Sequence, residues 1–269
     1  MHVWVDPLPE LAMFRCRPLG RYDGTMCNRY TAPDVVDIER AWNITGRNPL
    51  RWWEPVIAPL SPGPYIKAGG ELEVGQWGMI PPRSETRTPR TKEGKRMSTN
   101  NARDDRVASA WTYSGPWKHG QRCLVPATSF VEPYWGFGGK NIWWRFARAD
   151  GQSWALAGIW SEWTDPATGE VVPNYSMLTQ NCDGHPLLRL MHKPEKLPSG
   201  APEDKRAVVP IEAGDWDAWL HGTVEQARAL IKLPALELFA HGPEDPEKRV
   251  RLDLEAGQGV ATGDSGQLF

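Results

Sequence analysis

Cysteine is scarce in this chain: of 269 residues only Cys16, Cys27, Cys123 and Cys182 are cysteines, and they are widely spaced. A disulfide framework needs more cysteines at a higher density, so we expect these four to be thiols. A pair such as Cys182 and His185 supplies only half of a tetrahedral ligand set. The chain also lacks the Gly-rich phosphate-binding motif of nucleotide hydrolases. We therefore predict no metal site and no cofactor.

Long hydrophobic runs are absent as well. The longest apolar stretch, residues 154–160, includes a glycine and is far shorter than the ~18 residues that a membrane span needs. Residues 6–10, with two prolines and two acidic side chains, would interrupt the hydrophobic centre of a signal peptide. We expect a monomeric, cytoplasmic protein without a membrane partner.

The net charge is only −2, but the charge is unevenly distributed. Residues 83–122 contain ten Lys or Arg and four Asp or Glu, whereas residues 202–257 contain seven and twelve. A cationic segment that includes Trp111 and Trp117 suits single-stranded nucleic acid, because phosphates bind cations and bases stack on aromatic rings. On charge alone, a solvated surface loop is the alternative interpretation.

Proline and glycine, by contrast, are abundant, and they divide the middle of the sequence into short segments typical of strands and loops. Residues 82–100 are polar and basic without an apolar period, which predicts a long loop. The predicted strands are residues 71–80, 121–125, 141–147, 154–163 and 174–179, with a hairpin turn at residues 164–169.

Four segments show helical spacing or helix-capping residues. Thr31 is predicted to cap a helix that ends before Asn48 and has Val35, Ile38 and Trp42 on one face. These elements indicate an α+β fold, with a twisted antiparallel sheet or barrel-like core and flanking helices. The other predicted helices are residues 101–111, 213–220 and 224–233, the last opened by a capping box of Thr223 and Gln226.

The two ends of the chain differ from its middle. Residues 1–25 show no sustained period and contain three prolines, so we interpret them as a leader or an upstream extension outside the fold. Residues 241–269 are acidic and Gly-rich, and we expect disorder there. The predicted domain is therefore residues 26–240.

Five motifs follow one another along this domain. They are Met26-Cys27-Asn28-Arg29-Tyr30, Asn101-Ala102-Arg103, Arg122–Pro126 leading to Glu132, Leu156–Trp160, and Arg189-Leu190-Met191-His192. In this order and at these distances they resemble the SOS response-associated peptidase family, whose members crosslink themselves to abasic sites in single-stranded DNA. The resemblance spans about residues 26–220 and implies the same DNA partner for this chain.

The resemblance also implies that Cys27 is the reactive residue, exposed as a chain terminus. There a cysteine carries an α-amine with a pKa of roughly 7.7–8.0 beside a thiol at roughly 8.5. The amine condenses with an aldehyde to a Schiff base, and the thiolate then closes a thiazolidine ring. An abasic deoxyribose is such an aldehyde once its ring opens. Without the resemblance, Cys27 would be interpreted as a buried thiol.

The position of Cys27 poses a difficulty, since 26 residues precede it and an acylated amine forms no imine. One explanation is that Met26 is the true start and an aminopeptidase removes it. The other is that the leader is cut off, with the protein itself acting as a thiol autopeptidase. We favour the first, because residues 1–25 show no pattern of a fold.

Ring opening and imine formation both require proton transfers near neutral pH. The resemblance assigns them to Glu132, which follows an apolar run expected to raise its pKa, and to His192. His185, in a context typical of a turn, is the alternative histidine. Asn101 would orient the Cys27 amine or the sugar ring, although by itself it is predicted to be a helix cap.

DNA contacts are predicted from the resemblance and from charge. The resemblance implies roles for Arg29 and Arg103, and for Trp77 against a displaced base. Charge alone adds Arg106 and Arg122.

The family's Arg-Met-Pro run after the histidine is missing here, because this chain reads Lys193-Pro194-Glu195. We expect Arg206 to replace the missing arginine, or else Lys193 to act as a point charge without a bidentate fork.

Two other functions fit the residues. In an N-terminal-nucleophile amidohydrolase a propeptide is removed and Cys27 attacks an amide, with its own amine as base. A non-covalent single-strand binder would use only cations and tryptophans. The ordered set of five motifs favours the abasic-site crosslink over both.

Overall fold

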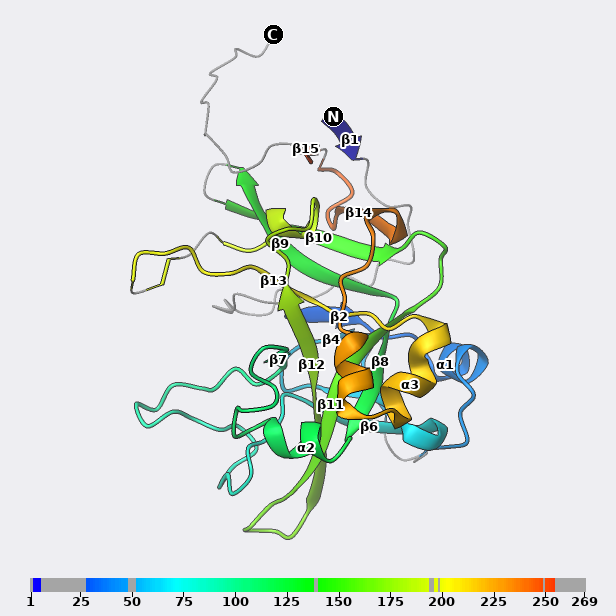
Figure 1. The fold of residues 1–269 in the computed structure, drawn as a ribbon, viewed down its shortest axis with the longest axis vertical. Coiled ribbons are helices and arrows are strands. Elements are labelled where there is room, and N and C mark those ends of the chain that lie inside the picture. The colour runs from blue at the N-terminus through cyan, green and yellow to red at the C-terminus, as the bar shows by residue number, and fades with distance from the viewer. Residues whose placement is uncertain are drawn as a thin grey trace.

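The structure is a computed structural model that describes residues 2–5, 28–47, 52–137, 140–193, 196–197, 199–248 and 250–254. Cys27 and the rest of residues 6–27 lie outside the described residues, as do residues 255–269. Strands dominate the described chain, and its helices are short (Figure 1).

Five strands close into a barrel. Neighbours along the ring β12–β11–β8–β5–β6 are antiparallel. The ring closes because β6 pairs in parallel with β12, through Gln76 opposite Asn174 and Trp77 opposite Tyr175. The predicted α+β fold with a barrel-like core is therefore confirmed. The strands are β5 (Pro62–Lys67), β6 (Glu71–Trp77), β8 (Arg122–Ala127), β11 (Trp154–Thr164) and β12 (Val171–Asn181).

Three short strands extend this sheet. β3 (Gly46–Arg47) and β7 (Asn101–Arg103) run parallel to β6 and β12, respectively, and β13 (Arg206–Val208) runs antiparallel to β12. Both β7 and β13 carry predicted site residues, so β12 holds two parts of the site in register.

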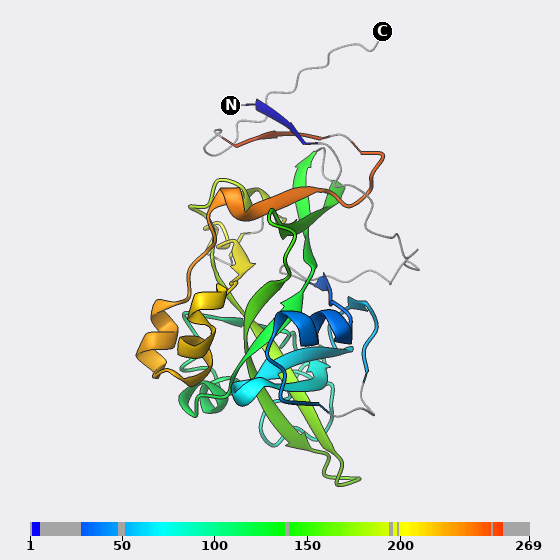
Figure 2. The same ribbon diagram turned by 90° about the vertical axis from the view of Figure 1, so that its right-hand side faces the viewer.

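A second, antiparallel sheet adjoins the barrel. Its order is β14 (Phe239–Pro243), β10 (Lys140–Arg148), β9 (Ser129–Phe137), β2 (Arg29–Thr31) and β4 (Val56–Ile57). Only Thr128 separates β8 of the barrel from β9, so the two sheets are directly connected. A ribbon of β1 (His2–Val5) and β15 (Val250–Asp253) lies at the end of the molecule opposite the β11–β12 hairpin (Figures 1 and 2).

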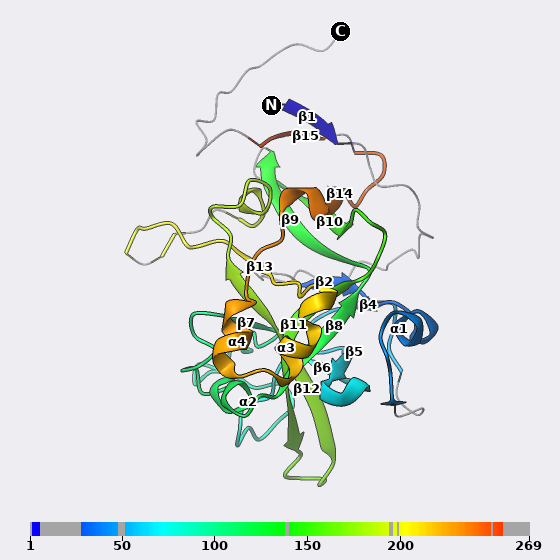
Figure 3. The same cartoon turned by 45° about the vertical axis from the view of Figure 1, so that its right-hand side comes forward.

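Alternation along the strands divides the core into two parts. In β11, Trp154 and Leu156 belong to one buried cluster, whereas Ala155, Ala157 and Ile159 belong to a second. This is the period of two that places successive side chains on opposite faces of a sheet. The second cluster includes Trp219 and Ala227 from the helices α3 and α4, which cover β8 and β11 (Figure 3). The helices are α1 (Val35–Ala41), α2 (Ser114–Lys118), α3 (Trp216–His221), α4 (Val224–Ala229) and the 3-10 helices η1 (Ala68–Gly70), η2 (Leu188–Leu190), η3 (Ala213–Asp215) and η4 (Leu236–Leu238).

Several local predictions are confirmed. The Thr223–Gln226 capping box opens α4, with both of its reciprocal hydrogen bonds present. The hairpin turn lies where predicted, and Asp165 organises it by accepting hydrogen bonds from the backbone N–H groups of Ala167 and Thr168. Residues 82–100 form a long loop without a named helix or strand.

Two helix predictions are wrong. Residues 101–111 do not form a helix, because Asn101–Arg103 pairs with β12 as β7 and turns follow. Thr31 is part of β2 and not a cap; the N-cap of α1 is Asp34, which accepts from the N–H of Asp37. In both cases pairing with a distant strand outweighs the local capping signal.

The described chain extends past the predicted domain end. Val250 and Leu252 of β15 are buried in the first core cluster, so the folded part continues to at least residue 252. Of the proposed leader, only residues 2–5 are described, and they pair with β15. Within the described ranges, no helix has the length and apolar character to cross a membrane.

Candidate active site

Glu132 is a buried carboxyl group in the middle of β9. It shares a face with Phe130 and Tyr134, two positions away on either side, and pairs with Trp144 of β10. Its residue surface is only 1% exposed. Such deep burial is rare for a glutamate, because removing a carboxylate from water is costly. Glu132 therefore stands out as a functional candidate.

His192 is placed against Glu132 by the backbone. Met191 forms an antiparallel bridge with Tyr134, and the N–H of His192 donates to the carbonyl of Pro133 at 2.6 Å. These contacts hold the turn after η2 onto β9. As a result, Nε2 of His192 lies 3.6 Å from Oε2 of Glu132.

The imidazole of His192 has a defined tautomer. Its Nε2 lies 2.8 Å from the carbonyl oxygen of Arg206, which only accepts, so Nε2 carries the proton and donates. Burial lowers the pKa of His192 to about 4, which outweighs the opposite effect of that hydrogen bond. The ring is therefore neutral near pH 7. Its Nδ1 is buried and accepts no hydrogen bond from the described residues.

The backbone of His192 is also unusual. Its φ is +64°, in the left-handed region that glycine favours. Non-glycine residues hold this conformation only where the surrounding contacts require it, and they cluster at functional sites. The contacts with Pro133 and Tyr134 provide that constraint.

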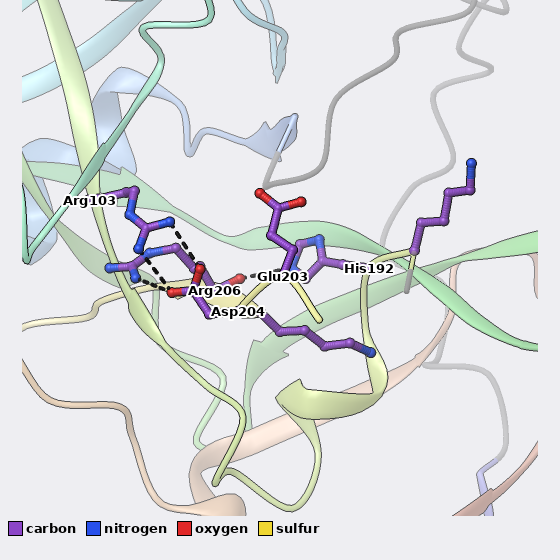
Figure 4. Close-up of a pocket in the computed structure, with 7 residues that line it drawn as sticks. Arg103, His192, Glu203, Asp204 and Arg206 are labelled. Carbon is purple, nitrogen blue, oxygen red and sulfur yellow. Dashed lines mark hydrogen bonds and ion pairs between the residues drawn. The ribbon is translucent and has the colours of Figure 1, made fainter. Parts of the chain in front are cut away.

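A charged cleft lies beside His192 (Figure 4). In it the carboxylate of Asp204 lies between the guanidinium groups of Arg103 and Arg206 (Figure 4). Arg103 donates to both Asp204 oxygens, at 3.0 and 3.1 Å, and Arg206 donates to Oδ2 at 2.7 Å. The cleft is lined by Arg103, His192, Lys193, Glu203, Asp204, Lys205 and Arg206.

Two further aspartates complete this network. Asp105 accepts two hydrogen bonds from Arg103, and Asp104 accepts one from Arg206. Burial works against the charged form of Asp204, but the hydrogen bonds from both arginines outweigh it and hold its pKa below the usual value. The pKa of Arg103 is raised, chiefly by its hydrogen bonds to Asp105. These shifts favour the charged forms of Arg103 and Asp204 at neutral pH.

The sequence matches a family model described as SOS response associated peptidase (SRAP) over residues 26–241. The chain belongs to this family. The predicted family resemblance is confirmed, and the match includes every predicted site residue.

A known protein and two of the solved structures that are similar to this chain show the extent of the similarity. The abasic site processing protein HMCES of Gallus gallus is 28% identical in an alignment of 121 residues that covers 39% of this chain and 35% of that protein. The chain thus matches only about a third of that relative's length. A Bordetella bronchiseptica crystal structure is 29% identical, with a TM-score of 0.70 over 81% of this chain and 99% of that one. A Bacteroides thetaiotaomicron structure shares the fold at 18% identity, with a TM-score of 0.62 over 80% and 90% of the two chains.

The structure places the remaining SRAP motif residues as follows. Arg29, the first residue of β2, pairs with Val131, directly before Glu132. Its guanidinium contacts Glu244 and lies 5.3 Å from the ring centre of Trp143. Asn101 is buried at the start of β7, opposite Met177 of β12. Cys27, the predicted reactive residue, lies outside the described residues.

Two predicted DNA contacts do not fit the structure. Trp77 is fully buried in the barrel and donates from Nε1 to the carbonyl of Asn100 at 2.9 Å, so it presents no face to a base. Arg122 is also buried, and it donates to the carbonyls of Trp219 and Gly222 at the end of α3. Both residues are therefore structural, the arginine as a cap of the last turn of α3.

Arg206 does not fit a direct phosphate contact either. It is 4% exposed, and its guanidinium is occupied by Asp104, Asp204 and Thr179. Its backbone carbonyl, however, orients His192, a role that the sequence did not reveal. Lys193 and Arg106 are exposed, and the Lys193 ammonium lies 5.7 Å from the ring centre of Trp135.

The alternative histidine has a structural role. His185 accepts from the N–H groups of Leu187 and Leu188 at Nδ1, while Nε2 lies 3.0 Å from the carbonyl of Pro234. Both ring nitrogens are thus occupied by backbone groups. Sequence reasoning missed Asp204, although the charged run 203–206 directly before the apolar residues 207–210 was a visible signal.

Proposed function

We propose that this chain captures abasic sites in single-stranded DNA by forming a thiazolidine between Cys27 and the sugar aldehyde. The observation that carries the proposal is the buried pair of Glu132 and His192 beside the start of β2. Cys27 lies two residues before Arg29, and two residues span at most about 7 Å. Arg29 itself pairs with Val131, the residue directly before Glu132.

The reaction requires a free α-amine on Cys27. Its nitrogen attacks C1′ of the ring-opened sugar, and water leaves as the imine forms. The sulfur then adds to the same carbon, and the thiol proton passes to the nitrogen. The product contains the protein and the DNA less one water molecule.

Glu132 is suited to move the protons of this reaction. Ring opening needs a proton on the ring oxygen and removal of one from the C1′ hydroxyl, which a single carboxyl group can exchange. His192 contributes a neutral imidazole whose Nε2–H is directed at Arg206 and lies near Glu132. Its Nδ1 is then the nitrogen available to accept a hydrogen bond from the sugar or the amine.

Three observations on relatives and charge support the DNA partner. The family assignment, the name of the Gallus gallus relative and the cationic residues 83–122 all point to it. Cys27 becomes a chain terminus in one of two ways: Met26 is the true start and an aminopeptidase removes it, or the leader is cut off by the protein itself.

Intact-mass measurement tests the proposal. Protein beginning at Cys27 is mixed with an oligonucleotide that carries one abasic site, and we expect a species with the summed mass less one water. The adduct should be absent for Cys27→Ala and for protein that retains residues 1–26, and present for Cys123→Ala. An adduct that forms equally with Cys27→Ala contradicts the proposal. Turnover of small amides without DNA would instead support the amidohydrolase, and lesion-independent, salt-sensitive binding the non-covalent binder.

A further inference from the structure

Asp204 occupies a position in the cleft that an anionic ligand would need. Its two oxygens receive three hydrogen bonds from two arginines, which is the recognition that guanidinium groups also give to phosphate. We propose that Asp204 acts as a built-in phosphate mimic, which must leave Arg103 before a DNA phosphate binds there. This inference rests on the proposed DNA partner, but not on the crosslinking chemistry.

The two arginines differ in the hydrogen-bond partners that they retain when Asp204 moves away. Without Asp204, Arg206 keeps Asp104 and the carbonyl of Thr179, and it stays buried. Among the described residues, Arg103 then keeps only Asp105, which accepts from Nε and Nη2. Loss of Asp204 therefore frees Nη1 of Arg103 completely and Nη2 partly.

Solvent exposure and charge favour the replacement of the Asp204 carboxylate by a phosphate at Arg103. The side chains of Arg103 and Asp204 are each 28% exposed, so solvent and a ligand reach the pair. With Asp204 in place, two arginines face three aspartates, so the ion-pair cluster has one more carboxylate than guanidinium, although Lys193 and Lys205 also line the cleft. With Asp204 turned away, the guanidinium charges balance Asp104 and Asp105.

Movement of Asp204 requires little rearrangement. It lies two residues before β13, whose pairing with β12 begins at Arg206. The next residue, Lys205, is fixed by backbone hydrogen bonds to Asp183 and Cys182. A rotation of the Asp204 side chain thus opens Arg103 while β13 and the His192–Arg206 contact stay in place.

The role of this device would be selectivity. A phosphate of a loosely bound strand competes for Arg103 with the Asp204 carboxylate, which already accepts two hydrogen bonds from that arginine. A strand anchored at other points of the site supplies its phosphate at high local concentration and displaces Asp204. Binding to undamaged single strands is thereby weakened more than binding to a captured lesion.

Affinity for an undamaged oligothymidylate tests the inference, with the full chain as the protein. We expect Asp204→Asn to bind roughly tenfold more tightly at low salt, because a repelling charge at the contact is removed. Glu203→Gln is the matched control: it removes the same charge from the same cleft, and no ion pair between described residues joins Glu203 to either arginine. We expect at most about a twofold gain there. The gain of Asp204→Asn should disappear in the Arg103→Ala background.

Two results would overturn the inference: equal gains for Asp204→Asn and Glu203→Gln, or a gain that survives Arg103→Ala. A measurement on the unaltered chain covers the case in which Asp204→Asn fails to fold. In an NMR titration with oligothymidylate, the Asp204 carboxyl and Arg103 guanidinium signals should shift together, and a static Asp204 signal contradicts the inference. The same titration is repeated with inorganic phosphate, which should shift the same two signals. This second titration depends neither on DNA binding nor on adduct formation.

Discussion

The Nε2 atom of His192 donates to the carbonyl oxygen of Arg206 at 2.8 Å, while the same atom lies 3.6 Å from Oε2 of Glu132. Because a carbonyl cannot donate, this contact fixes the proton on Nε2 and leaves the lone pair on Nδ1. The backbone of Arg206, and not its side chain, therefore orders the imidazole. The ring is neutral as long as burial keeps its pKa low.

Acid should destabilise the protein in a defined pH window. Burial lowers the pKa values of His192 and His241 to about 4, against ~6.5 in an unfolded chain. The unfolded state therefore binds more protons between these values, so stability is full above pH 6.5 and falls as the pH drops toward 4. We expect a loss of roughly 2 kcal/mol per histidine between pH 7 and pH 5, measured by urea unfolding.

Substitution separates the histidine effect from other groups. His192→Gln and His241→Gln should each flatten the slope of stability against pH in this window. The lowered pKa values of Asp105, Asp150 and Asp204 act only below about pH 4, where aspartates ordinarily titrate. An unchanged slope in both variants would contradict the assigned burial effect.

Arg122 and Arg106 should respond differently to removal of their charge. Arg122→Met deletes a buried cap of α3 and leaves two carbonyls without their donor, so we expect a loss of about 2–4 kcal/mol in unfolding free energy. Arg106→Ala removes an exposed cation and should change stability by less than about 0.5 kcal/mol. Binding to single-stranded DNA becomes weaker as salt rises, and the slope of log affinity against log salt concentration reports the number of phosphate contacts. We expect this slope to decrease by the equivalent of about one contact for Arg106→Ala, and to stay unchanged for Arg122→Met. A reduced slope for folded Arg122→Met would restore its predicted DNA role.

Trp77 and Trp111 give a similar contrast between burial and exposure. Trp77 is fully buried and Trp111 is 60% exposed. Trp77→Ala should cost about 3–5 kcal/mol through the cavity it leaves in the barrel, whereas Trp111→Ala should be nearly neutral for stability. Chemical denaturation followed by circular dichroism measures both. A neutral Trp77→Ala would contradict its position in the core.

These contrasts show which parts of the molecule the sequence could predict. The strands β8 and β11 were predictable because their apolar runs are long and end at polar or turn residues. The capping box of α4 is likewise local, since its donor and acceptor lie within four residues. Glu132 was predictable from the resemblance, but its apolar surroundings depend on Trp144 and Tyr134 meeting across a sheet.

Other features depend on contacts between distant residues. β7 is only three residues long, and it is a strand because Met177 and its neighbours in β12 lie alongside it. The charges of Arg122 and Arg206 suggested surface residues, yet both side chains are buried. Their hydrogen-bond acceptors are far away in the sequence: Trp219 for Arg122, and Asp104 and Thr179 for Arg206. A residue type gives the charge, and only the fold determines whether the charge faces solvent.

The strongest chemical prediction concerns the carboxyl group of Glu132. Glu132→Gln keeps the shape and the hydrogen-bonding capacity of the side chain but cannot exchange a proton, so adduct formation should slow by about 10²–10⁴-fold. The rate is measured by quenching the reaction with an abasic single strand at set times and separating the adduct by denaturing electrophoresis. Glu162→Gln, an exposed residue of β11, is the control and should react at the unaltered rate.

The form of the defect distinguishes chemistry from folding or binding. If Glu132 moves protons, the single-turnover rate at saturating DNA falls while the DNA concentration for half-maximal rate stays nearly constant. Supplying an abasic analogue with an already open aldehyde should then recover part of the loss, because ring opening no longer needs the carboxyl group. A defect confined to the half-maximal concentration, with an unaltered rate at saturation, would assign Glu132 to DNA positioning and remove proton transfer from the proposal.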